Sequence, residues 1–195
     1  MYLGKGGFIL VVLEGIDGTG KNTQIELLKK KLDCVIFKYP TSKYEMLNDY
    51  LEKKSSPDPK ALFLLFLADI ADGQENVKKA LEEEKTVILD RYVFSTISYE
   101  VNGIDFENGK KIVGSVGYLK PDMVLLLDID AETSQERKSR QKELDRYEEN
   151  SAYLENVRAN FLRLHEERFL TPNWHRIDAT KSIDAVHEEI MRLLS

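Results

Sequence analysis

The segment GIDGTGKNTQ, residues 15–24, places glycines and a lysine at the spacing Gly-x-x-x-x-Gly-Lys. Glycines let a backbone curl so that successive N–H groups face a phosphate, and the N-terminus of a following helix adds partial positive charge. A lysine directly after the last glycine supplies a full charge to the β- and γ-phosphates of a nucleotide. The spacing therefore predicts a phosphate-binding loop made of Gly15, Asp17, Gly18, Thr19, Gly20, Lys21, Asn22 and Thr23.

Asn22 departs from this pattern, which has Ser or Thr after the lysine. Three explanations are open: a working nucleotide site with an unusual metal ligand, a site that has lost its chemistry, and a chance match. The amide oxygen of Asn22 can still ligate Mg²⁺, whereas its NH₂ group cannot. Thr23 is about 100° further around a helix and is a poor substitute. An apolar run before the loop and a helical pattern after it argue against a chance match.

A second candidate site lies where the apolar segment VILDRY ends in Asp90 and Arg91. A carboxylate at the C-terminal end of a buried strand can hold Mg²⁺, directly or through water, beside nucleotide phosphates. An arginine next to it can bind a second phosphate through two parallel hydrogen bonds. A purely structural Asp–Arg pair is the alternative explanation. Ligands of parallel sheets bind at this end of the strands, which favours the phosphate site.

Short apolar runs alternate with helical patterns along the chain. Asp58 and Pro59 predict the N-cap and first turn of a helix that contains ALFLLFLADIA, which is apolar nearly all round and is therefore expected to be central. The alternation predicts an α/β fold with a mostly parallel five-stranded sheet and helices on both faces. A single domain over residues 1–195 is expected. The predicted strands are FILVVL, CVIFKY, TVILD, MVLLLDID and WHRID.

Composition sets limits on partners and location. The 195 residues are 42% hydrophobic and 32% charged, which is ordinary for a soluble globular protein. A formal net charge of −6 argues against a general nucleic-acid binder. The apolar opening run is too short to span a membrane, and no signal peptide precedes it. Cys34 is the only cysteine, which fits a reducing compartment. We expect a cytoplasmic protein without nucleic-acid or membrane partners.

Four segments, EGIDGTGKNTQ, LDRYVFSTISYE, PDMVLLLDID and LDRYEE, occur in an order that resembles the thymidylate kinases. The closing segment NWHRIDATKSIDAVHEEI is similar to the last strand and helix of that family, so the resemblance covers nearly the whole chain. It implies a P-loop kinase fold with a short lid near residues 136–150 and a homodimer built from helices. It also implies that ATP, with Mg²⁺, phosphorylates thymidine monophosphate (dTMP) to the diphosphate.

The resemblance also implies roles for residues that match the motifs of the family. Lys21 resembles the lysine on the ATP phosphates, and Asp17 the acidic residue near the sugar of the acceptor. Asp90 resembles the carboxylate associated with Mg²⁺, to which Asn22 would add a second metal ligand. Arg91 resembles the arginine on the acceptor phosphate. We therefore expect Lys21 and Arg91 to be catalytic, with Lys21 in an exposed loop.

Further residues are candidates for the acceptor pocket. Phe66 is similar to the aromatic residue that stacks on the acceptor base, although simple core packing would also explain it. Ser95 and Tyr99 follow the Asp-Arg-Tyr sequence and either line the pocket or pack within a helix. Tyr147 falls in the lid-like segment LDRYEE, where the family places an aromatic residue near the acceptor; an ordinary tyrosine beside a loop is the alternative.

The lid segment ERKSRQKELDR supplies several cations. Part of the family has a catalytic arginine inside the phosphate loop, where this chain has Gly18, and other members place arginines in the lid. Arg140 is our candidate for the catalytic lid cation, ahead of Arg137, because it is nearer to LDRYEE. A solvated, charged helix end is the alternative explanation of this segment.

Two more departures concern the acceptor. The family commonly has an arginine for the acceptor phosphate where this chain has Ser42, and many members have an arginine that contacts thymine where it has Ile70. The alternatives to a thymidylate kinase are a kinase of the same fold for another nucleoside monophosphate and a catalytically silent nucleotide-binding module. A GTP-driven switch is disfavoured because the chain has no Asn-Lys-x-Asp sequence for guanine.

Overall fold

A five-stranded sheet forms the centre of the computed structural model, which describes residues 9–99, 103–139 and 150–195. The strand order is β2-β3-β1-β4-β5, and every neighbouring pair is parallel. This confirms the predicted α/β fold and the five predicted strands, and the sheet is parallel throughout. The strands are β1 (Leu10–Glu14), β2 (Cys34–Lys38), β3 (Thr86–Asp90), β4 (Met123–Asp128) and β5 (Trp174–Asp178).

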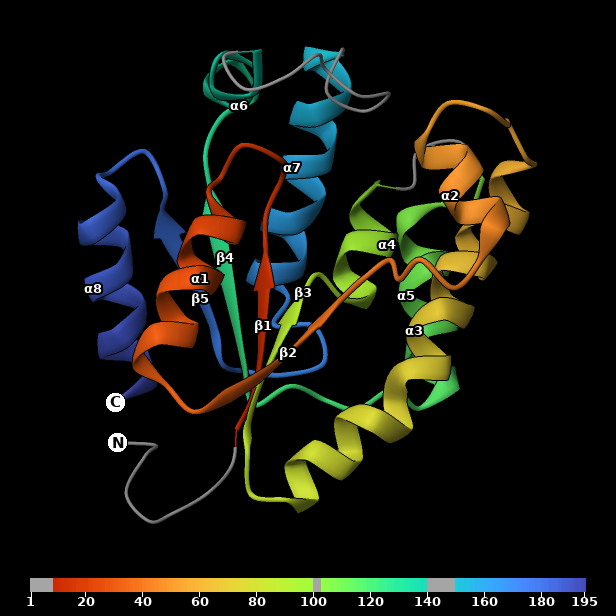
Figure 1. The fold of residues 1–195 in the computed structure, drawn as a ribbon. Coiled ribbons are helices and arrows are strands. Elements are labelled where there is room, and N and C mark those ends of the chain that lie inside the picture. Colours follow the sequence, from red (N-terminus) through yellow and green to blue (C-terminus); the bar gives the residue numbers. More distant parts are fainter. Residues whose placement is uncertain (1–8, 100–102, 140–149) are drawn as a thin grey trace.

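Helices cover both faces of the sheet, as the parallel crossovers require. Helices α1 and α8 lie side by side on one face, whereas α3, α4 and α7 lie on the other (Figure 1). The core between these layers combines strand residues such as Val12 and Ile88, both fully buried, with helix residues such as Leu28 and Phe161. The helices are α1 (Lys21–Lys31), α2 (Glu45–Leu51), α3 (Pro59–Glu82), α4 (Val93–Tyr99), α5 (Phe106–Val116), α6 (Ala131–Ser139), α7 (Ser151–Glu166) and α8 (Ile183–Leu194).

The start of α3 follows its sequence signals. Asp58 is the N-cap, and its carboxylate accepts hydrogen bonds from the backbone N–H groups of Lys60 (2.9 Å) and Ala61 (3.3 Å). Pro59 occupies the first turn, where its missing N–H has no helical partner to lose. The prediction that α3 is central is wrong, because Leu64 on this helix exposes 52% of its surface. One side of α3 packs on the sheet layer and the other remains outside.

The strand order determines where functional side chains can gather. Strand β1 lies between β3 and β4, so the chain leaves β1, passes over β3 through α1 and enters β2 at the edge. Such a reversal opens a crevice at the C-terminal ends of the strands. The register pairs Leu13 with Asp90 across β1 and β3, and Lys38 with Asp90 across β2 and β3. The ends of three strands therefore meet at one point.

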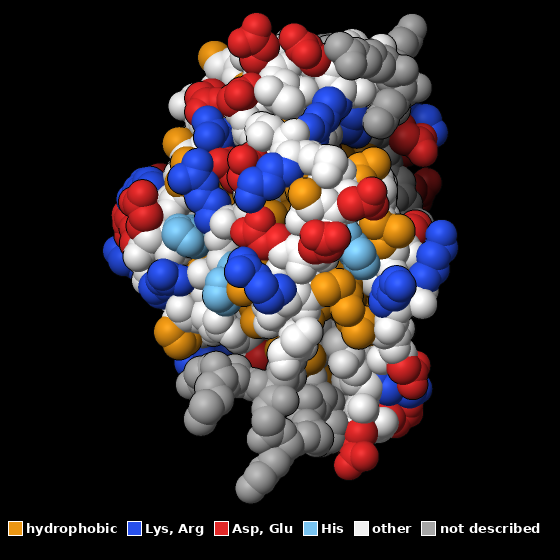
Figure 2. Space-filling view, turned by 90° about the vertical axis from the view of Figure 1, so that its left-hand side faces the viewer, with side chains coloured by type: hydrophobic (Ala, Val, Ile, Leu, Met, Phe, Trp, Pro, Cys, Tyr) orange, Lys and Arg blue, Asp and Glu red, His pale blue; other side chains and the backbone are white. Residues whose placement is uncertain are grey.

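The surface beside α8 mixes the two signs of charge (Figure 2). Lys and Arg side chains are interspersed with Asp and Glu, and neither sign dominates this face. In the part of the chain that the structure describes, no helix combines the length and the apolar composition needed to cross a bilayer.

A cluster of charges around the buried Asp128 joins α7 to the edge of the sheet. Asp128 at the end of β4 is 8% exposed and accepts hydrogen bonds from Arg158 of α7 (2.8 Å) and Arg176 of β5 (2.7 Å). Burial alone would raise the pKa of Asp128, but the hydrogen bonds and charges of the two arginines lower it below its usual value. The ionised carboxylate therefore stabilises the fold at neutral pH.

Asp128→Asn should lower the melting temperature, because an amide of the same shape cannot accept charge-assisted hydrogen bonds from both arginines. A decrease of about 2 kcal/mol in the free energy of unfolding lowers the melting temperature by roughly 4–8 °C in a chain of this length. Calorimetry or circular dichroism at neutral pH measures the shift. Lys181→Met is the matched control, since it removes an exposed ion pair with Glu189 and should change the melting temperature little. Equal melting temperatures for Asp128→Asn and the wild type would contradict a net stabilising cluster.

Candidate active site

The predicted phosphate loop connects β1 to α1, and close contacts require two of its glycines, Gly15 and Gly18. A Cβ atom on Gly15 would lie 2.3 Å from the carbonyl oxygen of Leu127, and one on Gly18 would lie 2.9 Å from the carbonyl oxygen of Ser134. Both glycines also have positive φ angles, 140° and 78°. Thr19 closes the loop internally, because its hydroxyl donates to the carbonyl oxygen of Ile16 (2.9 Å).

Lys21 is the first residue of α1, and the expectation that it lies exposed is wrong: only 6% of its surface is accessible. Its Nζ donates to the carbonyl oxygens of Gly15 (2.8 Å) and Ile16 (3.0 Å), so the lysine folds back beneath the loop. Burial and the nearby charge of Arg91 lower the pKa of Lys21 to about 8. An anion in the loop would therefore interact with a lysine that is already held in position.

Helix α6 supports the loop from outside. The Ser134 hydroxyl donates to the carbonyl oxygen of Asp17 (2.7 Å), and the Arg137 guanidinium donates to the carbonyl oxygens of Gly18 (3.3 Å) and Ala179 (2.9 Å). Sequence analysis named Arg137 only as a possible lid cation. In the structure this guanidinium joins α6, the phosphate loop and the segment after β5.

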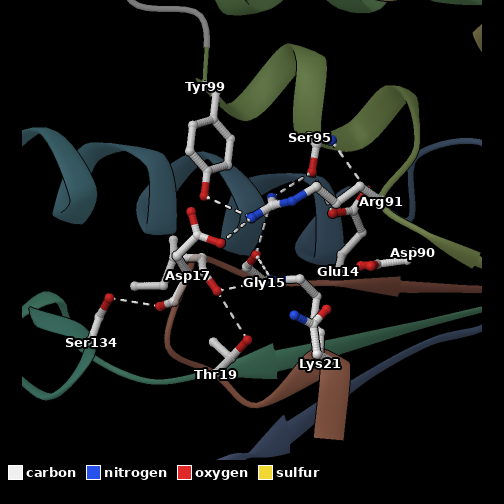
Figure 3. A network of polar contacts seen from close by, with 12 residues as sticks. Glu14, Gly15, Asp17, Thr19, Lys21, Asp90, Arg91, Ser95, Tyr99 and Ser134 are labelled. Atoms are coloured by element: carbon white, nitrogen blue, oxygen red, sulfur yellow. Dashed lines mark hydrogen bonds and ion pairs between the residues drawn. The ribbon is translucent and has the colours of Figure 1, made fainter. Parts of the chain in front are cut away.

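Arg91 is the centre of the polar network in Figure 3, and three predicted site residues surround it. Its guanidinium donates to the Asp17 carboxylate (2.7 Å), the Ser95 hydroxyl (3.1 Å) and the Tyr99 hydroxyl (3.4 Å). A further contact reaches the carbonyl oxygen of Gly15 (3.4 Å). Although burial would raise it, the charges of Arg91 and Lys21 hold the pKa of Asp17 well below its usual range. The structure therefore brings Arg91, Asp17, Ser95 and Tyr99 together.

The backbone of Arg91 is in the left-handed region, with φ of 69°. A non-glycine residue adopts this conformation only where its surroundings hold it, and such residues are common at functional sites. Here the Arg91 N–H donates to the carbonyl oxygen of Leu13 (3.1 Å), which ties the end of β3 to β1. This turn aims the guanidinium back over the phosphate loop (Figure 3).

Glu14 is a residue that our sequence analysis missed. It ends β1, is fully buried, and accepts hydrogen bonds from the N–H of Tyr92 (2.8 Å), the N–H of Ser95 (3.2 Å) and the Ser95 hydroxyl (2.7 Å). Burial raises the pKa of Glu14 to about 7, although Arg91 and the hydrogen bonds from the Ser95 hydroxyl and the Tyr92 N–H oppose the rise. The only sequence signal was an acidic residue at the end of an otherwise apolar strand.

Asp90 and Asn22, the two predicted metal ligands, lie near each other at the open end of the sheet. The Asp90 side chain is 3% exposed, and its Oδ1 is buried without a hydrogen-bond partner. Lys38, also missed by sequence analysis, places its Nζ 3.2 Å from Asp90 Oδ2 and 3.4 Å from Asn22 Oδ1. A carboxylate with an unpaired oxygen beside an amide oxygen is a donor set suited to Mg²⁺, which prefers oxygen ligands.

One cavity of about 800 Å³ opens between the phosphate loop and helices α3 and α4. Phe66 lines it as a half-buried ring, and Ile70 lines it one turn later although only 2% of its surface is exposed. The turn that contains Ser42 is fixed by Asp69, which accepts hydrogen bonds from the N–H (2.7 Å) and the hydroxyl of Thr41. Other lining residues include Asp17, Gly18, Gly20, Lys21, Asn22, Thr23, Lys38, Asp90, Arg91, Ser95, Tyr99 and Lys138.

Two predicted residues, Arg140 and Tyr147, lie outside the described residues, as does most of the predicted lid. The described parts of that segment are the end of α6, where Lys138 lines the cavity, and Asn150, which caps α7 and also lines it. Tyr153 at the start of α7 also lines it and donates a hydrogen bond to the carbonyl oxygen of Tyr99.

Comparisons with known proteins agree on one family. A family model described as thymidylate kinase matches residues 13–190. The chain is 38% identical to a probable thymidylate kinase of Methanocaldococcus jannaschii, over 95% of each chain. It is 34% identical to the human thymidylate kinase, over 95% of this chain and 89% of the human one. The solved structure of thymidylate kinase from Candida albicans superposes with a TM-score of 0.79 at 26% identity, covering 96% of this chain and 91% of that one.

Glu14→Gln should remove a pH dependence of stability. The folded-state pKa of Glu14 lies above the unfolded value, so its stabilising contribution is complete below about pH 4.5 and is lost as pH rises through about 7. Gln has no proton to lose. The melting temperature of the wild type, relative to Glu14→Gln, should therefore fall by several degrees between about pH 5 and pH 8.

Differential scanning fluorimetry across this pH range measures the difference. Glu26→Gln is the control, because Glu26 is exposed on α1, pairs with Lys29, and has a lowered pKa that lies below the range tested. A constant offset between Glu14→Gln and the wild type from about pH 5 to pH 8 would show that Glu14 stays ionised throughout.

Proposed function

Because the chain belongs to the thymidylate kinase family, and transfers the γ-phosphoryl group of ATP to dTMP, we propose how its own residues divide that reaction. The observation that carries the proposal is the convergence of Lys21 and Arg91 on one cavity. Two fixed cations from neighbouring strand ends can bind a donor phosphate and an acceptor phosphate side by side. No observation favours a different acceptor or a silent nucleotide-binding module.

The donor binds at the phosphate loop in this proposal. The backbone N–H groups of residues 15–22 and the N-terminus of α1 surround the β- and γ-phosphates. Lys21 exchanges the carbonyl oxygens of Gly15 and Ile16 for phosphate oxygens, which are the stronger partners of an ammonium group. Because Lys21 is already buried, it gives up little bound water when a phosphate replaces the carbonyl oxygens, and this favours the exchange.

The acceptor binds in the cavity beyond Arg91. The Arg91 guanidinium, already oriented by Asp17 and Ser95, binds the phosphate of dTMP through two hydrogen bonds. Phe66 supplies a ring on which the thymine can stack, and Tyr99 closes the same side. Asp17 is placed to contact the sugar of the acceptor, as the family resemblance implies.

We propose that Mg²⁺ enters with ATP and that Asp90 and Asn22 hold it, directly or through water. The Asp90 carboxylate, fixed at the end of β3 with its side chain 3% exposed, and the amide oxygen of the exposed residue Asn22 fit a hard cation. When bound, Mg²⁺ neutralises charge on the β- and γ-phosphates. The chain would contribute two oxygen donors, the carboxylate of Asp90 and the amide oxygen of Asn22.

The transfer needs positioning more than proton chemistry. An oxygen of the dTMP phosphate forms a bond to the γ-phosphorus while the bond from that phosphorus to the bridging oxygen breaks, and ADP leaves with the electron pair. The attacking phosphate is largely ionised near neutral pH, so no general base is required. Lys21 and Arg91 hold the two phosphates and offset charge on the group in transit. Arg140 remains our candidate for a third cation, supplied by the lid.

Two broader features belong to the same proposal. We propose a homodimer built from helices, and Leu64 of α3 is the kind of exposed apolar side chain that such an interface would bury. We also propose a cytoplasmic location for a single-domain enzyme, which the lone Cys34 supports because a reducing compartment requires no disulfide.

A coupled assay of ADP release tests the acceptor directly. The purified chain is supplied with ATP, Mg²⁺ and, in turn, dTMP, dUMP, dCMP, UMP and dGMP. We expect dTMP to give the highest kcat/KM. Faster turnover of another monophosphate would reassign the acceptor, and ATP binding without any turnover would indicate a silent module.

Lys21→Met should reduce kcat by at least about 100-fold, because a fixed cation on the transferring group contributes several kcal/mol to transition-state stabilisation. Methionine fills the buried site better than alanine would, so a normal melting curve separates lost catalysis from lost folding. Lys29→Met, on the exposed side of the same helix, should retain the wild-type rate. Retention of more than about a tenth of the rate by Lys21→Met would contradict a direct phosphate role.

The base specificity should be moderate, because Ile70 lines the cavity but cannot donate a hydrogen bond to O4 of thymine. We expect kcat/KM for dUMP, which lacks only the methyl group, to lie within about 10–200-fold of the value for dTMP. Ile70→Arg should widen discrimination against dCMP, whose amino group leaves the arginine donors unpaired. Ile70→Leu is the control for packing. Unchanged discrimination in Ile70→Arg would mean that another residue contacts the base.

A further inference from the structure

Lys38 places an ammonium group between the two side chains proposed for the metal. It is the last residue of β2, and the parallel register sets it directly beside Asp90, the last residue of β3. Its Nζ is 3.2 Å from Asp90 Oδ2 and 3.4 Å from Asn22 Oδ1. Lys38 also lines the cavity that contains Lys21.

The side chains of Lys38 and Asp90 differ in how freely they can move. The Asp90 side chain is 3% exposed and is fixed at the strand end, whereas the Lys38 side chain is 61% exposed. The ammonium group therefore approaches from the solvent and can withdraw without disturbing the core. Because Asp90 Oδ1 is buried, Oδ2 is the oxygen of this carboxylate that a cation from solvent reaches.

The residue after the phosphate-loop lysine matters for this contact. A serine or threonine hydroxyl can donate as well as accept, but the amide oxygen of Asn22 only accepts. It therefore attracts an ammonium group and a divalent cation alike. The two cations need the same pair of oxygens, and their like charges disfavour occupying them together.

We propose that Lys38 is a tethered cation that competes with the divalent metal for Asp90 and Asn22, and thereby sets the metal concentration that the site requires. This inference rests on the proposed metal role of those two residues. Without metal, Lys38 neutralises the carboxylate. As the metal–nucleotide complex enters, the ammonium group withdraws towards solvent on its flexible side chain.

Binding of Mn²⁺ to the complex with ADP tests the proposal without relying on turnover. The electron paramagnetic resonance signal of free Mn²⁺ gives the dissociation constant at saturating ADP. Lys38→Met should tighten Mn²⁺ binding by between about twofold and fivefold, the change that removal of an exposed ion pair represents. Lys85→Met is the control, since Lys85 pairs with Glu83 and precedes β3 at the opposite end of the sheet.

Two further measurements separate direct competition from a general charge effect. The tighter Mn²⁺ binding of Lys38→Met should persist at about 0.5 M KCl, where the Debye length is about 4 Å. It should also shrink in an Asn22→Ala background, because one of the two contested oxygens is gone. A gain that disappears in high salt and is equally large in Asn22→Ala would overturn direct competition.

A third outcome would also overturn the proposal. If Lys38→Met binds Mn²⁺ less tightly, and binds ADP more weakly in EDTA, Lys38 is a phosphate ligand and not a competitor of the metal. Turnover of dTMP by the same variants is measured separately, because it tests the proposed function and not the competition between Lys38 and the metal. Loss of dTMP turnover with tighter Mn²⁺ binding would question the acceptor and leave the competition intact.

Discussion

The carboxylate of Glu14 is the interaction on which the geometry of the site depends. It lies at the end of the central strand and accepts three hydrogen bonds, one from Tyr92 in the turn after β3 and two from Ser95 at the start of α4. A buried carboxylate without partners would destabilise the fold strongly, so these donors must stay where they are. They in turn hold Arg91 in a left-handed backbone conformation that an isolated chain would rarely adopt. The loop proposed to bind one phosphate and the arginine proposed to bind the other are thus parts of a single hydrogen-bonded unit.

This unit explains how a chain with a net charge of −6 can bind two anionic substrates. The positive charges of Lys21 and Arg91 lie within the site itself. The fold holds each of them against oxygen partners that a phosphate can replace. Lys21 is held by loop carbonyl oxygens, and Arg91 by Asp17 and Ser95. In the proposed binding mode, phosphates replace these partners without a search through side-chain rotamers, which reduces the entropy cost of binding. Pre-oriented charges of this kind also favour the transition state, since they need no reorganisation during transfer.

Local sequence signals were sufficient for the architecture and for the loop. Five apolar runs became five parallel strands, and Asp58 with Pro59 began α3, because each signal acts within one turn or one strand. The Gly-Lys spacing and the Asp-Arg-Tyr sequence likewise predicted which residues would approach each other. Two expectations failed for a shared reason. The exposure of Lys21 and the position of α3 depend on what packs around them, and a single segment does not contain that information.

The contacts that sequence analysis missed join residues far apart in the chain. Glu14 bonds to a turn 78 residues later, and Arg137 reaches a carbonyl oxygen 119 residues earlier. Lys38 is the clearest case, because its identity and spacing carry no motif. It meets Asp90 only because β2 pairs with β3 in one register. A shift of that register by one residue would turn Lys38 to the opposite face of the sheet. Lys38 would then no longer contact Asp90 and Asn22 and could not compete with a metal ion for them. The charge beside the proposed metal site is therefore a property of strand pairing, and it follows from the fold and from no single stretch of sequence.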